Sequence, residues 1–285
     1  MPSSQTDQNR EIRGFTLVEL LVVIGVITVL VAVVLHAASA LKDTAERGRE
    51  MSAARTLAQA WISYATDNRG AVRPGYAEGF EAQDEFGNPI ETESVPVAAK
   101  RWPWRLAGYL GTDIASFYSG EQRFRLSELS GQEYSETLYE VSAFPSFGLN
   151  SIFVGGDENY GGFSEIFTDT FGQFYVERLS TVRHPDDLIV FASAYSQEAQ
   201  PGSSNAELRE GYFRVLPPAW TQAFWADEVD PEDPASSGYV SSRHDAGVIT
   251  VSVDGRVQST PLEALRDMRR WSDSANAADW VLQPR

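Results

Sequence analysis

The chain of 285 residues contains no cysteine and only three histidines. Without cysteine it can form no disulfide and no thiolate metal site, and it offers no thiol nucleophile. The sequence also lacks the GxSxG, HExxH, P-loop and nucleotide-binding glycine motifs that mark common enzyme classes. We therefore expect a protein that is not an enzyme and that needs no cofactor, with calcium as the one metal to consider.

Basic residues are also scarce, because 23 Lys and Arg stand against 40 Asp and Glu, for a net charge of −17. Residues 1–70 carry seven of each sign, whereas residues 71–285 carry sixteen basic and thirty-three acidic side chains. Nucleic-acid binding depends on Lys and Arg that neutralise phosphates, so this balance argues against a nucleic-acid partner. The aromatic side chains, with 7 Trp, 11 Tyr and 15 Phe, indicate a packed core.

One long apolar run lies near the start of the chain. From Phe15 to Leu35 the only polar residues are Thr16, Glu19 and Thr28. About 20 apolar residues in a helix cross the roughly 30 Å hydrocarbon core of a bilayer, so the run predicts a membrane helix. A carboxylate inside such a segment costs about 2.5 kcal/mol or more and is usually retained for a function. Glu19 therefore needs a partner.

The residues Gly14-Phe15-Thr16-Leu17-Val18-Glu19 resemble the cleavage and methylation signature of type IV pilins and type II secretion pseudopilins. The resemblance implies that a prepilin peptidase cuts between Gly14 and Phe15 and methylates the new amino group of Phe15. It also implies that Glu19 pairs with the Phe15 amine of a neighbouring subunit in a filament. An ammonium from another chain would relieve the penalty on a carboxylate in low dielectric.

A cleaved secretory signal peptide is the alternative interpretation of the apolar run. Its apolar region has about 7–15 residues and ends in a small-residue cleavage site, whereas this run is longer and begins directly after Gly14. We therefore expect a cytoplasmic leader at 1–14, a transmembrane and spine helix at 15–67, and an acidic head domain at 68–285. The protein would cross the inner membrane once, with the head domain in the periplasm.

The helical pattern continues past Leu35 to about Asp67, where Asn68-Arg69-Gly70 supplies a stop signal. Apolar residues recur at helical spacing, at Leu41, Ala45, Ala54, Leu57, Trp61 and Tyr64. Residues 71–100 show no sustained period. A short helix beginning at Pro103 should bury Trp102 and Trp104 in the core, and residues 121–140 are also expected to be helical.

Strand signals dominate the rest of the chain and predict strands at 146–154, 174–176, 188–192, 212–215 and 248–253. Asp254-Gly255 gives a tight turn that returns the chain through 256–258 as a hairpin. Thr260-Pro261-Leu262-Glu263 reads as a capping box that starts a terminal helix ending near Trp271. The order of elements predicts an α+β, pilin-like fold, with a long N-terminal helix and an antiparallel sheet in the head domain.

A second resemblance lies near the C-terminus. His244, nine intervening residues and then Asp254-Gly255 are similar to the tail of a large group of bacterial prepilin-like proteins. Two weaker matches to the same group are Phe147-Gly148-Leu149-Asn150-Ser151 and Trp102-Pro103-Trp104. In physical terms Asp254-Gly255 forms a turn and His244 stands at the entry of a strand, which favours a structural role over ligand binding.

Calcium binding is a further hypothesis. Asp227, Asp230 and Asp233 lie in one acidic loop, and Asp157-Glu158-Asn159 lies between glycine pairs, so both offer the hard oxygens that calcium takes. Neither matches an EF-hand loop. The resemblance to major pseudopilins, known for a calcium site in a C-terminal loop, favours the first group.

We interpret the protein as a structural subunit of a type II secretion pseudopilus or a type IV pilus-like filament. The resemblance implies three kinds of partner: the prepilin peptidase, other pilin-like subunits and an inner-membrane assembly platform. One alternative is a monomeric membrane-anchored module that binds a cell-envelope polymer or calcium. A less favoured alternative is an anchored hydrolase around His244, with Ser241 or Ser242 and Asp245 or Asp254 nearby.

Overall fold

The computed structural model describes residues 16–84, 86–90, 95–111, 114–128, 133–199, 206–243 and 247–285. The chain divides into two compact units, residues 1–45 and residues 46–285. We call them the N-terminal unit and the globular unit. Helix α1, Leu17–Asp67, contributes its first part to the N-terminal unit and its remainder to the globular unit.

The C-terminal end of α1 falls where the sequence predicts it. Arg69 and Gly70 both adopt left-handed backbone angles, with φ of 56° and 83°. The Gly70 amide donates to the carbonyl of Ala65 at 2.7 Å, which satisfies an orphan carbonyl of the last turn. The stop signal at 68–70 is therefore confirmed.

Within the globular unit one face of α1 is buried, and its members recur every three or four residues: Ala54, Leu57, Trp61 and Ala65. Leu41 and Ala45 were expected on the same apolar face but are exposed. Both belong to the N-terminal unit, whose described side chains are all exposed. The buried stripe therefore begins only with the globular unit.

A four-stranded antiparallel sheet with the order β1-β2-β5-β6 forms the centre of the globular unit. Its strands are β1 (Phe147–Leu149), β2 (Ile189–Ser193), β5 (Val248–Ser252) and β6 (Val257–Thr260). Every residue of β2 and β5 is buried, so both faces of these central strands are covered. One core cluster joins Ile249 and Val251 to Leu57 and Trp61 of α1, and a second joins Val248 to Trp271.

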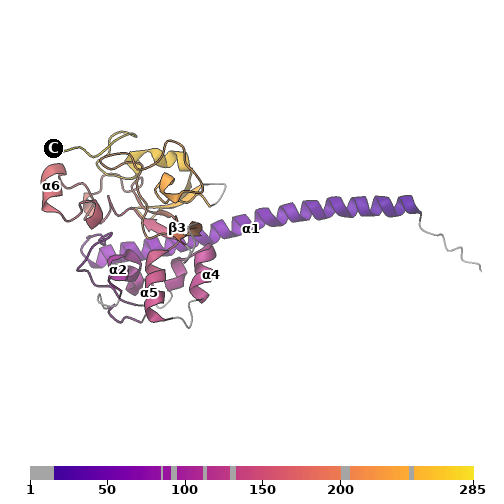
Figure 1. Cartoon of the computed structure of the whole chain (residues 1–285), viewed down its shortest axis with the longest axis horizontal. Helices are drawn as coiled ribbons and strands as arrows, with labels where there is room; N and C mark the ends of the chain where they lie inside the picture. Colours follow the sequence, from indigo (N-terminus) through magenta and orange to yellow (C-terminus); the bar gives the residue numbers. More distant parts are fainter. Residues whose placement is uncertain are drawn as a thin grey trace, which may run out of the picture. The chain divides into compact units, whose positions relative to one another are not determined.

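The short helices are α2 (Pro96–Lys100), α3 (Trp102–Leu106), α4 (Gly120–Glu128), α5 (Tyr134–Ala143) and α6 (Glu165–Phe171). Figure 1 shows α2, α4 and α5 grouped on one side of the globular unit, with the C-terminal residues on the other. Trp102 and Trp104 are buried as predicted, each 1% exposed. The single helical stretch expected at 121–140 is divided between α4 and α5.

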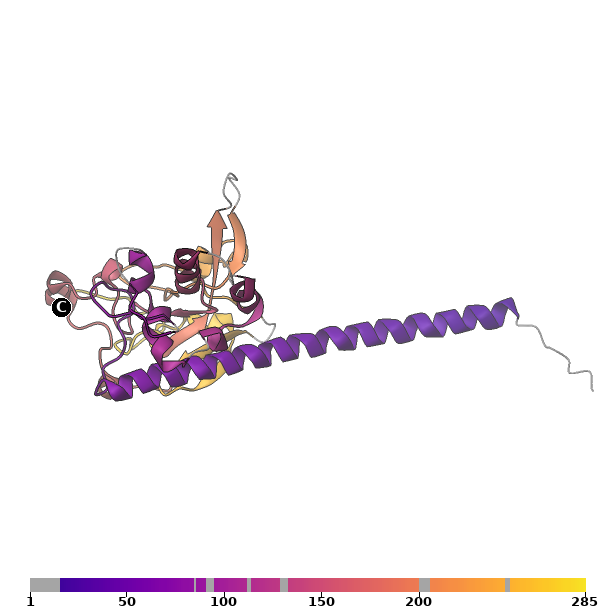
Figure 2. The ribbon, with the colours of Figure 1, turned by 90° about the horizontal axis from the view of Figure 1, so that it is seen from below.

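Two of the predicted strands are single bridges instead. Val176 pairs only with Val154, and Arg214 only with Leu149. A two-stranded ribbon of β3 (Tyr195–Ala199) and β4 (Ala206–Glu210) was not predicted, because its residues are mostly polar and charged. Figure 2 shows this ribbon standing away from the body of the globular unit.

The prediction of a terminal helix that starts with a capping box at Thr260 is wrong. The segment forms two 3-10 turns, η6 (Leu262–Arg266) and η7 (Met268–Arg270), which are separated by Asp267 in an extended conformation. Thr260 is the last residue of β6, and its hydroxyl lies 2.9 Å from that of Thr250 rather than capping a helix. Leu265 of the first turn, Met268 of the second and Trp271 directly after it lie together in the second core cluster.

Candidate processing and assembly site

The N-terminal signature is described from Thr16 onward, so Gly14 and Phe15 lie outside the described residues. Thr16 and Glu19 form a reciprocal capping box at the start of α1. The Thr16 amide and hydroxyl donate to Glu19 Oε2 at 2.9 and 2.8 Å, and the Glu19 amide lies 3.2 Å from Thr16 Oγ1. Glu19 therefore has a partner within its own chain, and both side-chain bonds end on the same carboxylate oxygen.

The first part of α1 buries none of its apolar surface within the chain. Leu17 is 79% exposed, Leu30 is 59% exposed, and every residue from 16 to 38 is exposed. Among the described residues α1 is the one helix long and apolar enough to cross a membrane. Thr28, the one hydroxyl-bearing residue between positions 20 and 38, donates to the Ile24 carbonyl at 2.7 Å, so that polar group is satisfied along the helix.

The turn of the C-terminal resemblance forms as predicted between β5 and β6. Gly255 has φ of 85°, a conformation that favours glycine, and its amide donates to the Ser252 carbonyl at 2.9 Å. Asp254 Oδ1 accepts the Arg256 amide at 2.9 Å. A Cβ on Gly255 would lie 2.8 Å from Ile62 Cδ1, so the turn packs closely on α1. Asp254 and Gly255 therefore have a structural role.

His244 and Asp245 lie outside the described part of the chain, so the hydrolase arrangement around them has no described geometry. Of the neighbouring serines, Ser241 is buried and its amide donates to the Ser193 carbonyl at 2.8 Å. Asp254, one of the two acids considered for that arrangement, serves the hairpin turn.

The two weaker matches of the resemblance are structural elements. The side-chain amide of Asn150 donates to the carbonyls of Ile189 and Trp271, at 3.0 and 2.8 Å, and so joins β2 to the C-terminal segment. Trp102 Nε1 donates to the Phe213 carbonyl at 2.9 Å, and Trp104 Nε1 to the Leu138 carbonyl at 2.7 Å. These three side-chain donor groups are thus satisfied within the fold.

The acids proposed for calcium do not gather. Among the described residues there is no group of three or more His, Cys, Asp or Glu side chains that could hold a metal ion. Asp230 and Asp233 instead accept backbone amides two residues further on, at 2.9 and 3.0 Å, and the Asp227 carbonyl accepts from Arg266 at 2.9 Å. The three carboxylates therefore do not form a common group in this structure, because local turns use those of Asp230 and Asp233, and calcium binding stays a prediction.

The second acidic group is likewise used within the fold. Asp157 is buried, its carboxylate accepts the Ser151 hydroxyl at 2.6 Å, and it lies 3.0 Å from Arg214 Nη2. Burial raises the pKa of Asp157, while Arg214 and the hydrogen bonds from Ser151 and Asn159 oppose that rise. Glu158 pairs with Lys100 at 3.0 Å.

A buried ionic network that the sequence analysis missed joins α1 to the sheet. Glu50 is 2% exposed, and its Oε1 accepts the Ser193 hydroxyl at 2.5 Å. Arg243 Nη2 lies 3.7 Å from the same oxygen and donates to the carbonyls of Ser146 and Ala194. Nothing local marks Glu50 as buried, because Ser193 and Arg243 are distant in sequence.

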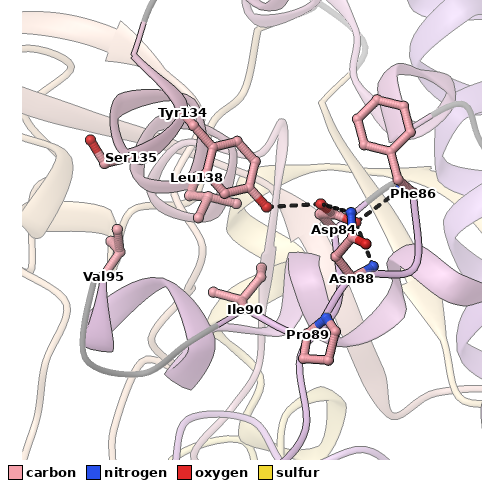
Figure 3. A pocket seen from close by; sticks show the side chains of 9 residues that line it. All are labelled: Asp84, Phe86, Asn88, Pro89, Ile90, Val95, Tyr134, Ser135 and Leu138. Carbon is pink, nitrogen blue, oxygen red and sulfur yellow. Dashed lines mark hydrogen bonds between the residues drawn. The ribbon is translucent and has the colours of Figure 1, made fainter.

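A pocket of about 430 Å³ lies between α5 and the segment before α2, with Phe86, Ile90, Val95 and Leu138 among its apolar walls (Figure 3). Its one acid, Asp84, already accepts four hydrogen bonds: from the amides of Phe86 and Asn88, the Asn88 side chain and the Tyr134 hydroxyl. Burial by itself raises the pKa of Asp84, but the four hydrogen bonds together lower it by more, so that the net pKa lies below the ordinary value. Asp84 therefore stabilises the fold rather than serving as a reactive group.

Comparison with known proteins agrees with the geometry of the N-terminus. A family model described as the prokaryotic N-terminal methylation motif matches residues 9–35. No curated protein and no solved structure matches the chain. The matched range contains Gly14, Phe15, the Thr16–Glu19 capping box and the exposed apolar part of α1. The chain thus carries the N-terminal methylation signature that type IV pilins and pseudopilins share.

Proposed function

We propose that the protein is a structural subunit of a type II secretion pseudopilus or a type IV pilus-like filament, assembled through the N-terminal part of α1. The observation that carries the proposal is the methylation motif at 9–35, continuous with a helix whose residues 16–38 are all exposed. Such a surface is costly in water and requires lipid or other helices as its surroundings. The role is structural rather than catalytic.

In this proposal the peptidase removes residues 1–14 and methylates Phe15, and the subunit waits in the inner membrane with its globular unit in the periplasm. Before assembly the capping box with Thr16 satisfies part of the Glu19 carboxylate. Because both bonds end on Oε2, Oε1 can accept the Phe15 ammonium of a neighbouring subunit. Replacing a bare carboxylate by a charge pair favours association in low dielectric.

Intact-mass analysis of protein purified from native membranes tests the processing step. We expect loss of residues 1–14 and the gain of one methyl group. Gly14→Val should block cleavage, whereas Gly25→Ala, in the same apolar segment, should leave it unchanged. A wild-type chain that is uncut, or cut elsewhere, contradicts the proposal.

Filament recovery from cells that express the secretion or pilus machinery tests the assembly step. Glu19→Ala should be processed normally but fail to enter filaments, while Thr28→Ala should assemble. Thr16→Val separates the two roles of Glu19, because it removes the hydroxyl of the cap, worth about 1 kcal/mol, and leaves the carboxylate in place. Normal assembly of Glu19→Ala, or a wild-type protein that stays monomeric, would refute the charge-pair mechanism.

A further inference from the structure

The pocket between α5 and the segment before α2 has apolar walls that belong to the core of the globular unit. Ile90 and Leu138 line it, are 7% and 2% exposed, and lie in the same core cluster as Leu57 and Trp61. Its volume of about 430 Å³ falls within the range of about 300–1,000 Å³ that is usual for small-molecule sites. The pocket can therefore hold a small ligand and bury its apolar side.

One aromatic ring at this pocket is exposed although its backbone is held by hydrogen bonds. Phe86 is 77% exposed, and its amide donates to Asp84 Oδ1 at 2.9 Å. The Gly87 amide donates to the Asp84 carbonyl at 3.0 Å, and the Asp84 amide donates to the Asn88 carbonyl at 2.9 Å. Gly87 allows this turn with φ of 82°. A ring presented by such a turn loses little backbone freedom when it meets a ligand.

Tyr134 of α5 supplies a second ring. It is 54% exposed, and its hydroxyl donates to Asp84 Oδ2 at 2.8 Å, so the carboxylate that holds the turn also orients Tyr134. Figure 3 shows Asn88 and Ser135 on opposite sides of the pocket. The side-chain nitrogen of Asn88 donates to Asp84 at 2.9 Å. Its side-chain oxygen can accept a hydrogen bond from a ligand, and the Ser135 hydroxyl can donate or accept one.

The chemistry of these walls favours a neutral ligand. The described lining residues include no Lys, Arg or His, so an anion would meet no opposite charge there. Asp84 is 3% exposed and already accepts four hydrogen bonds, with which a cation would have to compete. A wholly apolar ligand would cover Asn88 and Ser135 without offering them partners, which is unfavourable. The matching ligand is neutral, with an apolar face and a polar edge.

A neutral sugar ring has this division, because its C–H groups form an apolar face and its hydroxyls lie around the edge. We propose that the pocket binds a neutral saccharide unit, with Phe86 and Tyr134 supplying aromatic surface and Asn88 and Ser135 bonding its hydroxyls. Asp84 is the positioning residue, since it holds the other polar and aromatic groups in place. The inference goes beyond the proposed filament role and does not depend on it, because it concerns the globular unit alone.

Saturation-transfer difference NMR on the full-length protein tests for binding, because this method detects weak complexes. The protein is kept in micelles of a detergent without a sugar headgroup, so that the detergent itself cannot occupy the site. The neutral probes are maltotriose, cellotriose and triacetylchitotriose. Trigalacturonate, which has similar rings but a carboxylate on each, and hexanol are the charged and apolar comparisons. We expect signals from at least one neutral trisaccharide, and weaker binding of trigalacturonate and hexanol.

Titration of the neutral probe that binds most tightly locates the site. Phe86→Ala should weaken binding about tenfold, and Ser135→Ala about threefold. Ser135→Trp should fill the pocket and abolish binding. Phe124→Ala is the matched control, since it removes another exposed ring, 63% exposed on α4 and outside the pocket, and should leave the affinity unchanged. Unchanged thermal unfolding would show that the variants remain folded.

Each contrary outcome overturns the inference in a different way. If every neutral trisaccharide is silent, the pocket is not a saccharide site. A probe that binds wild type, Phe86→Ala and Ser135→Trp equally must bind elsewhere on the protein. Tighter binding of trigalacturonate or of hexanol would assign the pocket to an anionic or an apolar ligand. The proposed function is tested separately, by processing and filament recovery, and can fail while saccharide binding holds.

Discussion

The two parts of α1 share a helix but differ in what surrounds their apolar side chains. From Leu17 to Leu35 the leucines and valines are exposed on every side, whereas in the globular unit Leu57 and Trp61 are at most 1% exposed. The second part carries charged residues on its outer face, whereas the only charged residue between Leu17 and Leu35 is Glu19. A helix that is apolar all round needs lipid or other subunits, while one with a single apolar stripe is satisfied by its own chain.

Two carboxylates, Glu19 in the first part and Glu50 in the second, differ in the kind of partner they have. Glu50 is held by Ser193 and Arg243, which belong to the sheet side of the same globular unit. Glu19 is exposed and has only the local capping box with Thr16. The comparison implies that substitutions in the second part of α1 change folding, whereas substitutions in the first part change processing and assembly.

The largest expected effect is at the buried stripe. Trp61→Ala should lower the free energy of unfolding of the globular unit by about 3–5 kcal/mol, because it leaves a large cavity against the sheet. Val22→Ala, 56% exposed in the N-terminal unit, should leave that stability unchanged. Denaturant titration of the full chain in detergent, followed by near-ultraviolet circular dichroism, measures both. Equal losses for the two variants would break the comparison.

The second prediction contrasts the two acids. Glu50→Ala should destabilise the globular unit by about 3 kcal/mol, since it takes one of two carboxylates away from the buried Arg243 and removes an acceptor of the Ser193 hydroxyl. Glu19→Ala should not alter the same unfolding curve, although we expect it to abolish the proposed assembly. A stable Glu50→Ala protein would show that the remaining partners of Arg243, which are Glu210 and two carbonyls, suffice.

A third prediction concerns pH and the globular unit alone. The lowered pKa of Asp84 means that its contribution to stability is present above the unfolded value of about 3.9 and is lost as the pH falls through the lower folded value. Asp84→Asn should cost about 1–2 kcal/mol at pH 7 and flatten part of the acid-induced loss. Asp169→Asn, exposed on α6, is the control. Parallel curves for Asp84→Asn and wild type down to pH 3 would exclude this role.

The smallest effect should separate two glycines. Gly255→Ala is strained by its φ of 85° and by the contact with Ile62, so we expect a loss of about 1 kcal/mol. Gly25 has open space around its α-carbon, and Gly25→Ala should leave unfolding unchanged. Thermal unfolding in one detergent compares them directly. A destabilised Gly25→Ala protein would mean that the N-terminal unit contributes to the fold.

The features predictable from the sequence are those encoded by neighbouring residues. The methylation signature, the stop of α1 at 68–70 and the Asp254-Gly255 turn depend on short patterns, and each was identified. The capping box predicted at Thr260 was equally local, but it did not form. Thr260 instead ends strand β6, where its hydroxyl bonds with that of Thr250 on β5. A local pattern predicts correctly only where no distant contact competes.

The remaining features depend on residues far apart in the chain. Glu50 and Ser193 are separated by 143 positions, so no pattern around Glu50 announces its burial. The β3–β4 ribbon is polar and held at its base by Arg209, which pairs with Glu140 and stacks on Phe144. The loop at 227–233 contains carboxylates of the kind that calcium binds, but local turns use those of Asp230 and Asp233. Composition reveals which groups are present, whereas topology decides which groups meet.

The hydrogen bonds of the Asn150 side-chain amide imply an order in which parts of the chain can fold. Its two acceptors lie at Ile189 and, 121 positions away, at Trp271. At synthesis rates of about 5–20 residues per second, roughly 6–24 seconds pass between the appearance of Asn150 and that of Trp271. Until then β2 lacks one covering layer, and a chain delivered from its N-terminus keeps this strand available to chaperones or proteases. The segment that contains Trp271 therefore closes this part of the fold only after β2 has been synthesised.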